Sequence, residues 1–252
     1  MMTRRGVVLG VWLLGISLIS PARAGLESLQ YLSEEYKPFN YTQPSGHPAG
    51  LAVELLERIW KRTHTQPQVI RFLPWARAYQ RLQLQPGTVL FSTARTRTRD
   101  SLFHWACPIA RTPIVLLALR SRQLHLDNLQ QLATYHVMAV RADVGEQLLH
   151  TQTDSWLKLD TTHNLELALK QLRAGRIDVL SFNERVARQV WQEMGEQDAA
   201  LQTLWSLGEQ EFCFAFSPGT STQLIAQFRQ ALQQEVSSEG YPQLLERYQL
   251  RH

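Results

Sequence analysis

The residues with the most distinctive chemistry lie in the segment FSTARTRTRDSLFHWACP, residues 91–108, where Arg95, Arg97 and Arg99 occupy every second position. A guanidinium binds a carboxylate through two parallel hydrogen bonds and keeps its charge at physiological pH. A row of arginines is also typical of nucleic-acid binding. If the segment is extended, the three side chains share one face. The spacing alone therefore fits either a clamp for an anion or a nucleic-acid-binding stripe.

The N-terminus predicts export. Residues 1–24, MMTRRGVVLGVWLLGISLISPARA, place Arg4 and Arg5 before an apolar run and end in Ala22-Arg23-Ala24, which is the pattern of a cleaved secretory signal peptide. The apolar run, residues 6–19, is shorter than the ~20 residues that a membrane-spanning helix needs.

The charge balance argues against nucleic acid. The chain has 26 Lys and Arg and 22 Asp and Glu, and cleavage would remove Arg4, Arg5 and Arg23 but no acid, which leaves 23 against 22. Nucleic-acid binding depends on neutralising many phosphates. A mature chain with a net charge near +1 is a poor candidate for it, so we expect no nucleic-acid partner.

Motifs for catalysis or metal binding are missing from the sequence. The histidines are scattered without an HExxH pattern or a cysteine cluster, and there is no G-x-S-x-G elbow or phosphate-binding loop. We therefore expect no metal site, no cofactor and no enzymatic activity.

Short apolar runs alternate with helical patterns along the chain, which indicates an α/β fold. Residues 143–151, DVGEQLLHT, open with Asp143 and carry Glu146 three positions later, the spacing of a capping box at a helix start. The expected helices are residues 50–63, 75–83, 143–151, 164–174 and two near the C-terminus, and the expected strands are residues 68–73, 88–93, 112–120, 136–142, 176–183 and 212–216.

The chain resembles the bacterial extracellular solute-binding proteins of the polar amino-acid type, the periplasmic receptors of ABC importers. The resemblance covers essentially all of the mature chain. It is carried, in order, by EYKPFNY and GHPAGLAVELLERI, by TARTRTRDSLFHWACPI, by HVMAVRADVGEQLL, by LRAGRIDVLSFNE, and by FAFSPGT before the terminal helices.

This resemblance implies a two-lobed periplasmic-binding-protein fold with two crossing hinge segments and a cleft between the lobes. The boundaries it implies are residues 1–24 for the signal peptide, 25–111 and 212–252 for lobe 1, and 112–211 for lobe 2. It also implies a periplasmic monomer that binds a small carboxylate-bearing solute and delivers it to an inner-membrane ABC permease.

The family's binding residues carry over position by position. Arg99 corresponds to the arginine that holds the ligand carboxylate, and Arg95 is expected to be a solvated surface charge. The resemblance further implies an aromatic wall, a carbonyl for an ammonium group and a helix start whose amides meet the second carboxylate oxygen. These positions are Tyr36, Phe39, Trp75, Ser92, Asp143, Val144 and Gly145. Core packing is the alternative for Phe39, Tyr36 and Trp75.

Two positions depart from the family pattern. The family often has an aspartate for the ligand's ammonium where this chain has Asn183, and Ala94 stands where a hydroxyl is usual. Burying an unpaired ammonium is unfavourable. Either Glu184, Glu35 or Asp143 supplies the missing acid, or the ligand lacks an α-amine.

Two other functions remain open at this point. A freestanding receptor would present its ligand to a membrane sensor, and an enzyme on the same fold, such as a dehydratase, would need Glu35 or Glu184 as its acid or base. The family topology also places Cys107 just before the chain leaves lobe 1 and Cys213 just after it returns, so a disulfide between them is one expectation and two reduced, buried thiols the other.

Overall fold

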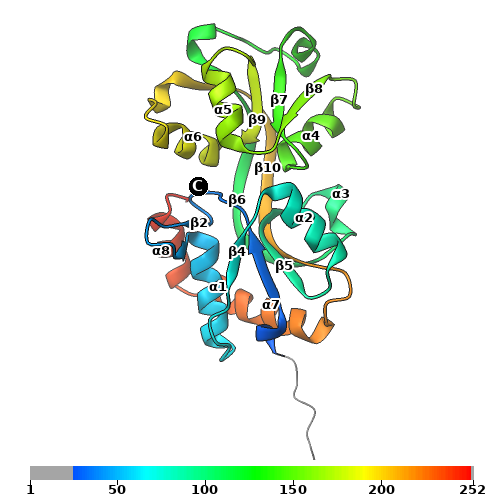
Figure 1. Cartoon of the computed structure of the whole chain (residues 1–252), viewed down its shortest axis with the longest axis vertical. Coiled ribbons are helices and arrows are strands. Elements are labelled where there is room, and N and C mark those ends of the chain that lie inside the picture. Colours follow the sequence, from blue (N-terminus) through cyan, green and yellow to red (C-terminus); the bar gives the residue numbers. More distant parts are fainter. Residues whose placement is uncertain (1–24, 251–252) are drawn as a thin grey trace, which may run out of the picture.

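The computed structural model describes residues 25–250. The predicted signal peptide lies outside these residues. Two α/β lobes lie one above the other, and two long strands run vertically through both of them (Figure 1). Within residues 25–250, no helix is long and apolar enough to cross a membrane.

The strands are β1 (Gln30–Ser33), β2 (Tyr41–Thr42), β3 (Pro48–Ala49), β4 (Ile70–Phe72), β5 (Thr88–Ala94), β6 (His104–Leu119), β7 (Val137–Val140), β8 (Leu159–Thr162), β9 (Val179–Asn183) and β10 (Leu201–Phe216). The α-helices are α1 (Leu51–Arg62), α2 (Trp75–Leu84), α3 (Arg97–Asp100), α4 (Val144–Gln152), α5 (Leu165–Arg173), α6 (Glu184–Glu193), α7 (Thr222–Val236) and α8 (Gly240–Arg247). The 3₁₀ turns are η1 (Leu26–Ser28), η2 (Arg120–Arg122), η3 (Leu129–Thr134) and η4 (Asp198–Ala200).

One mixed sheet extends through both lobes. Its strand order is β4-β1-β5-β10-β6-β9-β7-β8, so β10 and β6 lie at the centre. Strands β1, β4 and β5 are mutually parallel on the lobe 1 side, and β7, β8 and β9 are parallel on the lobe 2 side. The crossover helices of each group cover the sheet faces, which confirms the α/β class.

The two crossing strands pair with each other along almost their whole length. Strands β6 and β10 are antiparallel from Leu201↔Leu119 to Phe216↔His104. Their register shifts at three places, between Thr203 and Trp205, Ser206 and Gly208, and Phe212 and Phe214. The lobe boundaries expected from the sequence, at residues 111/112 and 211/212, fall inside these strands.

Helix α1 shows how a sequence pattern becomes a packed element. Leu51, Leu55 and Ile59 lie on one stripe, and all three are fully buried in the core. The helix starts at Gly50, whose φ of 116° and close approach to the carbonyl of Phe39 leave no room for a side chain.

Several expected elements differ in extent. Strand β6 begins eight residues before the predicted strand at 112–120, and its first half is a run of mainly apolar, buried or half-buried residues between His104 and Arg111. The sequence pattern did not predict β1, β8, the first part of β10, or helix α6. The segment with the three arginines is the main correction, because residues 97–100 form the short helix α3 and not an extended strand.

Candidate functional site

A small cavity lies between the lobes. It contains about 180 Å³ of space between atoms, but none of that space admits a water-sized sphere. Lobe 1 contributes residues after β1, at the start of α2, in β5, in α3 and in β10, and lobe 2 contributes the start of α4. The lining residues are Glu34, Tyr36, Trp75, Ser92, Ala94, Arg99, Asp143, Val144 and Phe212.

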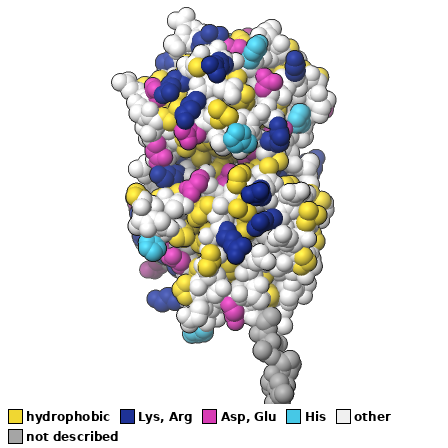
Figure 2. Space-filling model, viewed as in Figure 1, with side chains coloured by type: hydrophobic (Ala, Val, Ile, Leu, Met, Phe, Trp, Pro, Cys, Tyr) yellow, Lys and Arg dark blue, Asp and Glu magenta, His cyan; other side chains and the backbone are white. Residues whose placement is uncertain are grey.

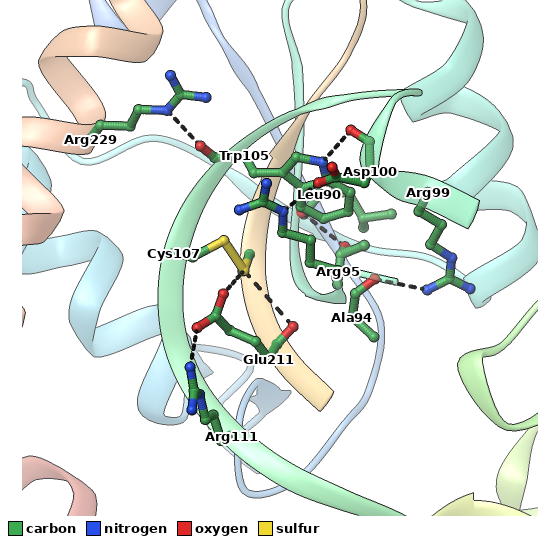
Figure 3. Close-up of a disulfide and its surroundings, with 12 residues drawn as sticks. Leu90, Ala94, Arg95, Arg99, Asp100, Trp105, Cys107, Arg111, Glu211 and Arg229 are labelled. Carbon is green, nitrogen blue, oxygen red and sulfur yellow. Dashed lines mark hydrogen bonds and ion pairs between the residues drawn. A yellow bond between two sulfur atoms is a disulfide. The ribbon is translucent and has the colours of Figure 1, made fainter. Parts of the chain in front are cut away.

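Arg99 lies at the centre of this site. Arg99 is only 1% exposed. Its guanidinium donates from Nη1 to the Ala94 carbonyl (3.3 Å, Figure 3) and from Nη2 to the Ala142 carbonyl (2.8 Å). Its Cζ lies 5.2 Å from the ring centre of Trp75 and 5.1 Å from that of Tyr79, which are cation–π distances. Burial lowers the pKa of Arg99, while Tyr79, Asp143 and Tyr36 oppose that shift. Its Nε has no hydrogen-bond partner among the described residues.

The short helix α3 separates the three arginines. Successive residues of a helix are rotated by about 100°, so residues two apart point to opposite sides. Arg97 is exposed while Arg99 is buried. Arg95 precedes the helix and forms an exposed ion pair with Asp100 (2.6 Å, Figure 3). The shared face expected for an extended chain is therefore wrong.

The aromatic wall is built from two layers. Tyr36 lines the cavity and packs on Phe39, Phe182 and Phe212 at centroid distances of 5.9, 5.6 and 5.7 Å. Phe39 does not line the cavity; it is fully buried behind Tyr36 and Phe212, as the core-packing alternative expected. Tyr36 is 3% exposed, and its hydroxyl has no partner among the described residues.

The carbonyl of Ala142 connects the two lobes. It accepts from Trp75 Nε1 (2.7 Å) and from Arg99 Nη2 (2.8 Å), both in lobe 1. Ala142 has φ of 60°, a left-handed conformation that is rare for a residue with a Cβ. Two further pairs cross between the lobes, Thr96 to Gln147 at 2.8 Å and Lys37 to Glu193 at 2.8 Å. The structure is thus a closed conformation.

The start of α4 does not offer the free amides that the resemblance implies. Asp143 caps the helix by accepting from the Gly145 amide (3.0 Å), and Glu146 accepts from the Ala142 amide. Gly145 does not line the cavity, and a Cβ there would lie 2.8 Å from the Ser181 carbonyl oxygen. Lobe 2 therefore presents to the cavity a carboxyl group, that of Asp143, and the apolar Val144.

Asn183 has a structural role at the end of β9. Its side-chain oxygen accepts from the Val186 amide (3.0 Å) at the start of α6, and its side-chain nitrogen donates to the Thr112 hydroxyl (2.9 Å). Asn183 is fully buried and does not line the cavity. Glu184 is also outside the lining and pairs with Arg188 at 3.0 Å.

Ser92 lies in an irregular part of β5. Its φ is 57°, next to a register shift in the pairing with β10, and such bulges turn backbone groups out of the ladder. Its hydroxyl donates to the side-chain oxygen of Asn40. Ser92 is 8% exposed and lines the cavity.

The acid that faces the cavity from lobe 1 is Glu34, which the sequence did not single out. Desolvation raises its pKa well above the usual range, and Asp143 raises it further while Arg99 opposes both. Desolvation also raises the pKa of Asp143, while hydrogen bonds from the amides of Gly145 and Val144 lower it. Glu35, the neighbour named from the sequence, instead accepts from the amide (3.0 Å) and hydroxyl (2.5 Å) of Thr42.

The structure contains a disulfide between Cys107 and Cys213, with an S–S distance of 2.06 Å (Figure 3). It joins β6 to β10 within lobe 1. Glu211 lies beside the two sulfurs and pairs with Arg111 at 3.4 Å. Because both sulfurs are used in the bridge, this group offers no thiolate for a metal.

Comparison with solved structures places the fold among two-lobed binding proteins. A histidine kinase sensor domain with similarity to periplasmic binding proteins has a TM-score of 0.78 at 19% identity, covering 88% of this chain and 95% of that one. The arginine-, lysine-, histidine-binding protein ArtJ from Geobacillus stearothermophilus has a TM-score of 0.74 at 16% identity, with 87% and 94% covered. An ancestral amino-acid-binding protein, a precursor of cyclohexadienyl dehydratase, has a TM-score of 0.74 at 17% identity, with 89% and 96% covered.

These likenesses confirm the two-lobed fold. Because the sequence identities are below 20%, they say nothing about the ligand. A search of curated proteins finds no match. A family model matches residues 31–251, which is nearly all of the described chain. The chain belongs to the bacterial extracellular solute-binding proteins, family 3.

Proposed function

We propose that this protein is a periplasmic solute-binding protein that closes around a small carboxylate-bearing ligand, with Arg99 holding the carboxylate. Arg99 carries the proposal because it is a cation buried in the interlobe cavity with one nitrogen, Nε, unpartnered. Retaining a desolvated charge is costly unless a partner is paired with it. A ligand carboxylate is a geometrically matched partner for a guanidinium.

Closure gives the proposal its mechanism. The bonds from Trp75 and Arg99 to the Ala142 carbonyl form only when the lobes are together. Separation of the lobes exposes the cavity, and closure then removes water from around the bound solute. In such a dry site each charged hydrogen bond is stronger than it is in water.

The test is a thermal-shift screen of purified protein with amino acids, other carboxylates and short peptides, followed by titration calorimetry. A ligand at 100 times its dissociation constant adds ~2.7 kcal/mol to the free energy of unfolding. Arg99→Ala should lower the affinity by about 2 to 5 kcal/mol, the range for removing one partner of a buried charged pair.

Arg95→Ala is the matched control, because Arg95 is an exposed arginine in the same segment that pairs with Asp100. It should bind as the wild type does. No response to any carboxylate, or equal affinities for Arg99→Ala and wild type, would contradict the proposal. Mass spectrometry of the recovered ligand separates binding from the enzyme alternative, since a binding protein returns its ligand unchanged.

We further propose that the monomeric protein hands its solute to an ABC permease in the inner membrane. The family supports this partner, while the similarity to a histidine kinase sensor domain supports the alternative of a membrane sensor. Figure 2 shows acidic and basic side chains interspersed with hydrophobic ones on the face in view. Uptake of labelled solute by cells with and without the gene distinguishes transport from sensing.

A further inference from the structure

We infer that Glu34 receives a positively charged nitrogen of the ligand, so that the solute carries both a carboxylate and a cationic nitrogen. This inference rests on the proposed function, because it concerns the same cavity. It assigns the cation-binding role to the end of β1 in lobe 1, whereas the sequence pattern directed attention to Asn183 at the end of β9 in lobe 2.

The backbone holds Glu34 at the cavity while leaving its carboxyl group available. Its carbonyl oxygen accepts from the side-chain nitrogen of Asn40 at 2.6 Å, which fixes the chain just after β1. Within residues 25–250, no hydrogen bond or ion pair is found for the Glu34 carboxyl group. Glu35 differs, because its side chain bonds to Thr42 and it does not line the cavity.

Other groups on the cavity wall also lack partners. The hydroxyl of Tyr36, 3% exposed, and Nε of Arg99, 1% exposed, are both buried and unpartnered among the described residues. Buried polar atoms in native proteins are nearly always hydrogen-bonded. Three neighbouring groups of different character, an acid, a cation and a hydroxyl, therefore indicate a polar ligand that contacts all three.

The charges on the wall favour a cation over a second anion. With both carboxyl groups ionised, Glu34 and Asp143 outnumber Arg99 by one negative charge. The amides at the start of α4, which could have held more negative charge, are taken by Asp143 and Glu146. A dicarboxylate would place its second group against two acids, whereas a cationic nitrogen would neutralise them.

The ionisation of the two acids agrees with this arrangement. Desolvation raises the pKa values of both Glu34 and Asp143; the charge of Asp143 raises that of Glu34 further, and the charge of Glu146 raises that of Asp143. A cation placed between Glu34 and Asp143 would lower both pKa values and favour the ionised forms. Glu34 is the stronger candidate because part of the Asp143 carboxyl group is already used in capping α4.

The experiment compares ligands that differ only in the nitrogen. Wild-type protein is screened by thermal shift with the standard amino acids, with amine-free monocarboxylates such as propionate and butyrate, and with the dicarboxylates succinate and malate. We expect an amino acid to give the largest shift and its amine-free counterpart and the dicarboxylates to give little. A larger shift with an amine-free acid would overturn the inference while leaving the proposed function intact. No shift with any carboxylate would overturn both.

Glu34→Gln and Glu35→Gln then test the residue. Glu34→Gln keeps the size of the side chain and removes its charge, so the affinity for the best amino acid should fall by roughly 10- to 150-fold, the effect of losing a hydrogen bond to a charged group. Glu35→Gln should bind within about twofold of wild type. Equal affinities for the two variants would overturn the assignment. Melting temperatures without ligand show that both variants fold, and the wild-type screen decides the ligand class in any case.

Discussion

Removing the disulfide between Cys107 and Cys213 should cost much of the protein's stability. The bridge spans 106 residues of sequence, so the loop that it closes contains all of lobe 2. In the chain-entropy model a loop of about 100 residues contributes about 4.7 kcal/mol, because it restricts the unfolded chain. For a chain of this size, each kcal/mol shifts the melting temperature by about 2–4 °C, so we expect a drop of roughly 10–20 °C in the Cys107→Ala/Cys213→Ala variant.

The order in which the lobes unfold decides whether the full effect is seen. If lobe 2 is still folded when lobe 1 opens, the pairing of β6 with β10 inside lobe 2 already holds the two chain segments together. The effective loop is then short and the entropic contribution small. The full value therefore belongs to unfolding in a single cooperative step.

Urea denaturation followed by circular dichroism and by tryptophan fluorescence measures both the loss of stability and the cooperativity of unfolding. We expect coincident transitions and a lower midpoint in the double alanine variant, with reduced wild-type protein behaving similarly. Two coincident, cooperative transitions with unchanged free energies of unfolding would refute the entropic reasoning. Mass spectrometry of alkylated, non-reduced protein provides the control that the wild-type bridge is formed.

Two further predictions concern charge in the cavity and at its edge. Because the pKa of Glu34 is raised, the folded protein keeps a proton on this group at pH values where the unfolded chain has released it. The free energy of unfolding of the protein should therefore fall as the pH rises above 4.5, the ordinary glutamate value. The charge of Asp143 raises the pKa of Glu34 further while Arg99 opposes the shift, so Glu34→Gln should reduce the fall, as urea titrations between pH 4 and 8 would show. Asn183→Asp should lower stability, because it loses the donor to Thr112 and buries a carboxylate, but it should leave ligand affinity unchanged in calorimetry. Tighter or weaker binding without a stability change would place Asn183 at the ligand after all.

The sequence was sufficient to predict an element or a candidate site residue where a local pattern determines the structure. Helix α1 was predicted because its apolar residues recur at helical spacing and bury one face. The capping box at Asp143 identified the start of α4. Arg99 was singled out because a carboxylate clamp needs a guanidinium and because the family order of motifs indicated this one of the three arginines. The structure buries it at the interlobe cavity, while its role in ligand binding stays a prediction.

The sequence was insufficient where tertiary contacts decide which way a side chain points. Glu34 and Glu35 are adjacent and identical in type, and only the turn after β1, held by Asn40, directs one to the cavity and the other to Thr42. Asn183 was expected at the ligand because it stands where the family often has an aspartate. Helix α6 was not recognised in the sequence, so the role of Asn183 as the cap of that helix was hidden.

The continuous central sheet has a mechanical consequence for the two lobes. Because β6 and β10 are paired from end to end, lobe movement is a bending of a two-stranded ribbon and not a swing about a loose linker. The three register shifts along β10 are where extra residues interrupt the ladder, and at such places a strand bends most readily. Gly208, with φ of 109°, lies at the middle one. Bending this ribbon costs elastic energy. The lobe angle at which the ribbon is unstrained therefore determines how much of the ligand's binding free energy is needed to close the lobes.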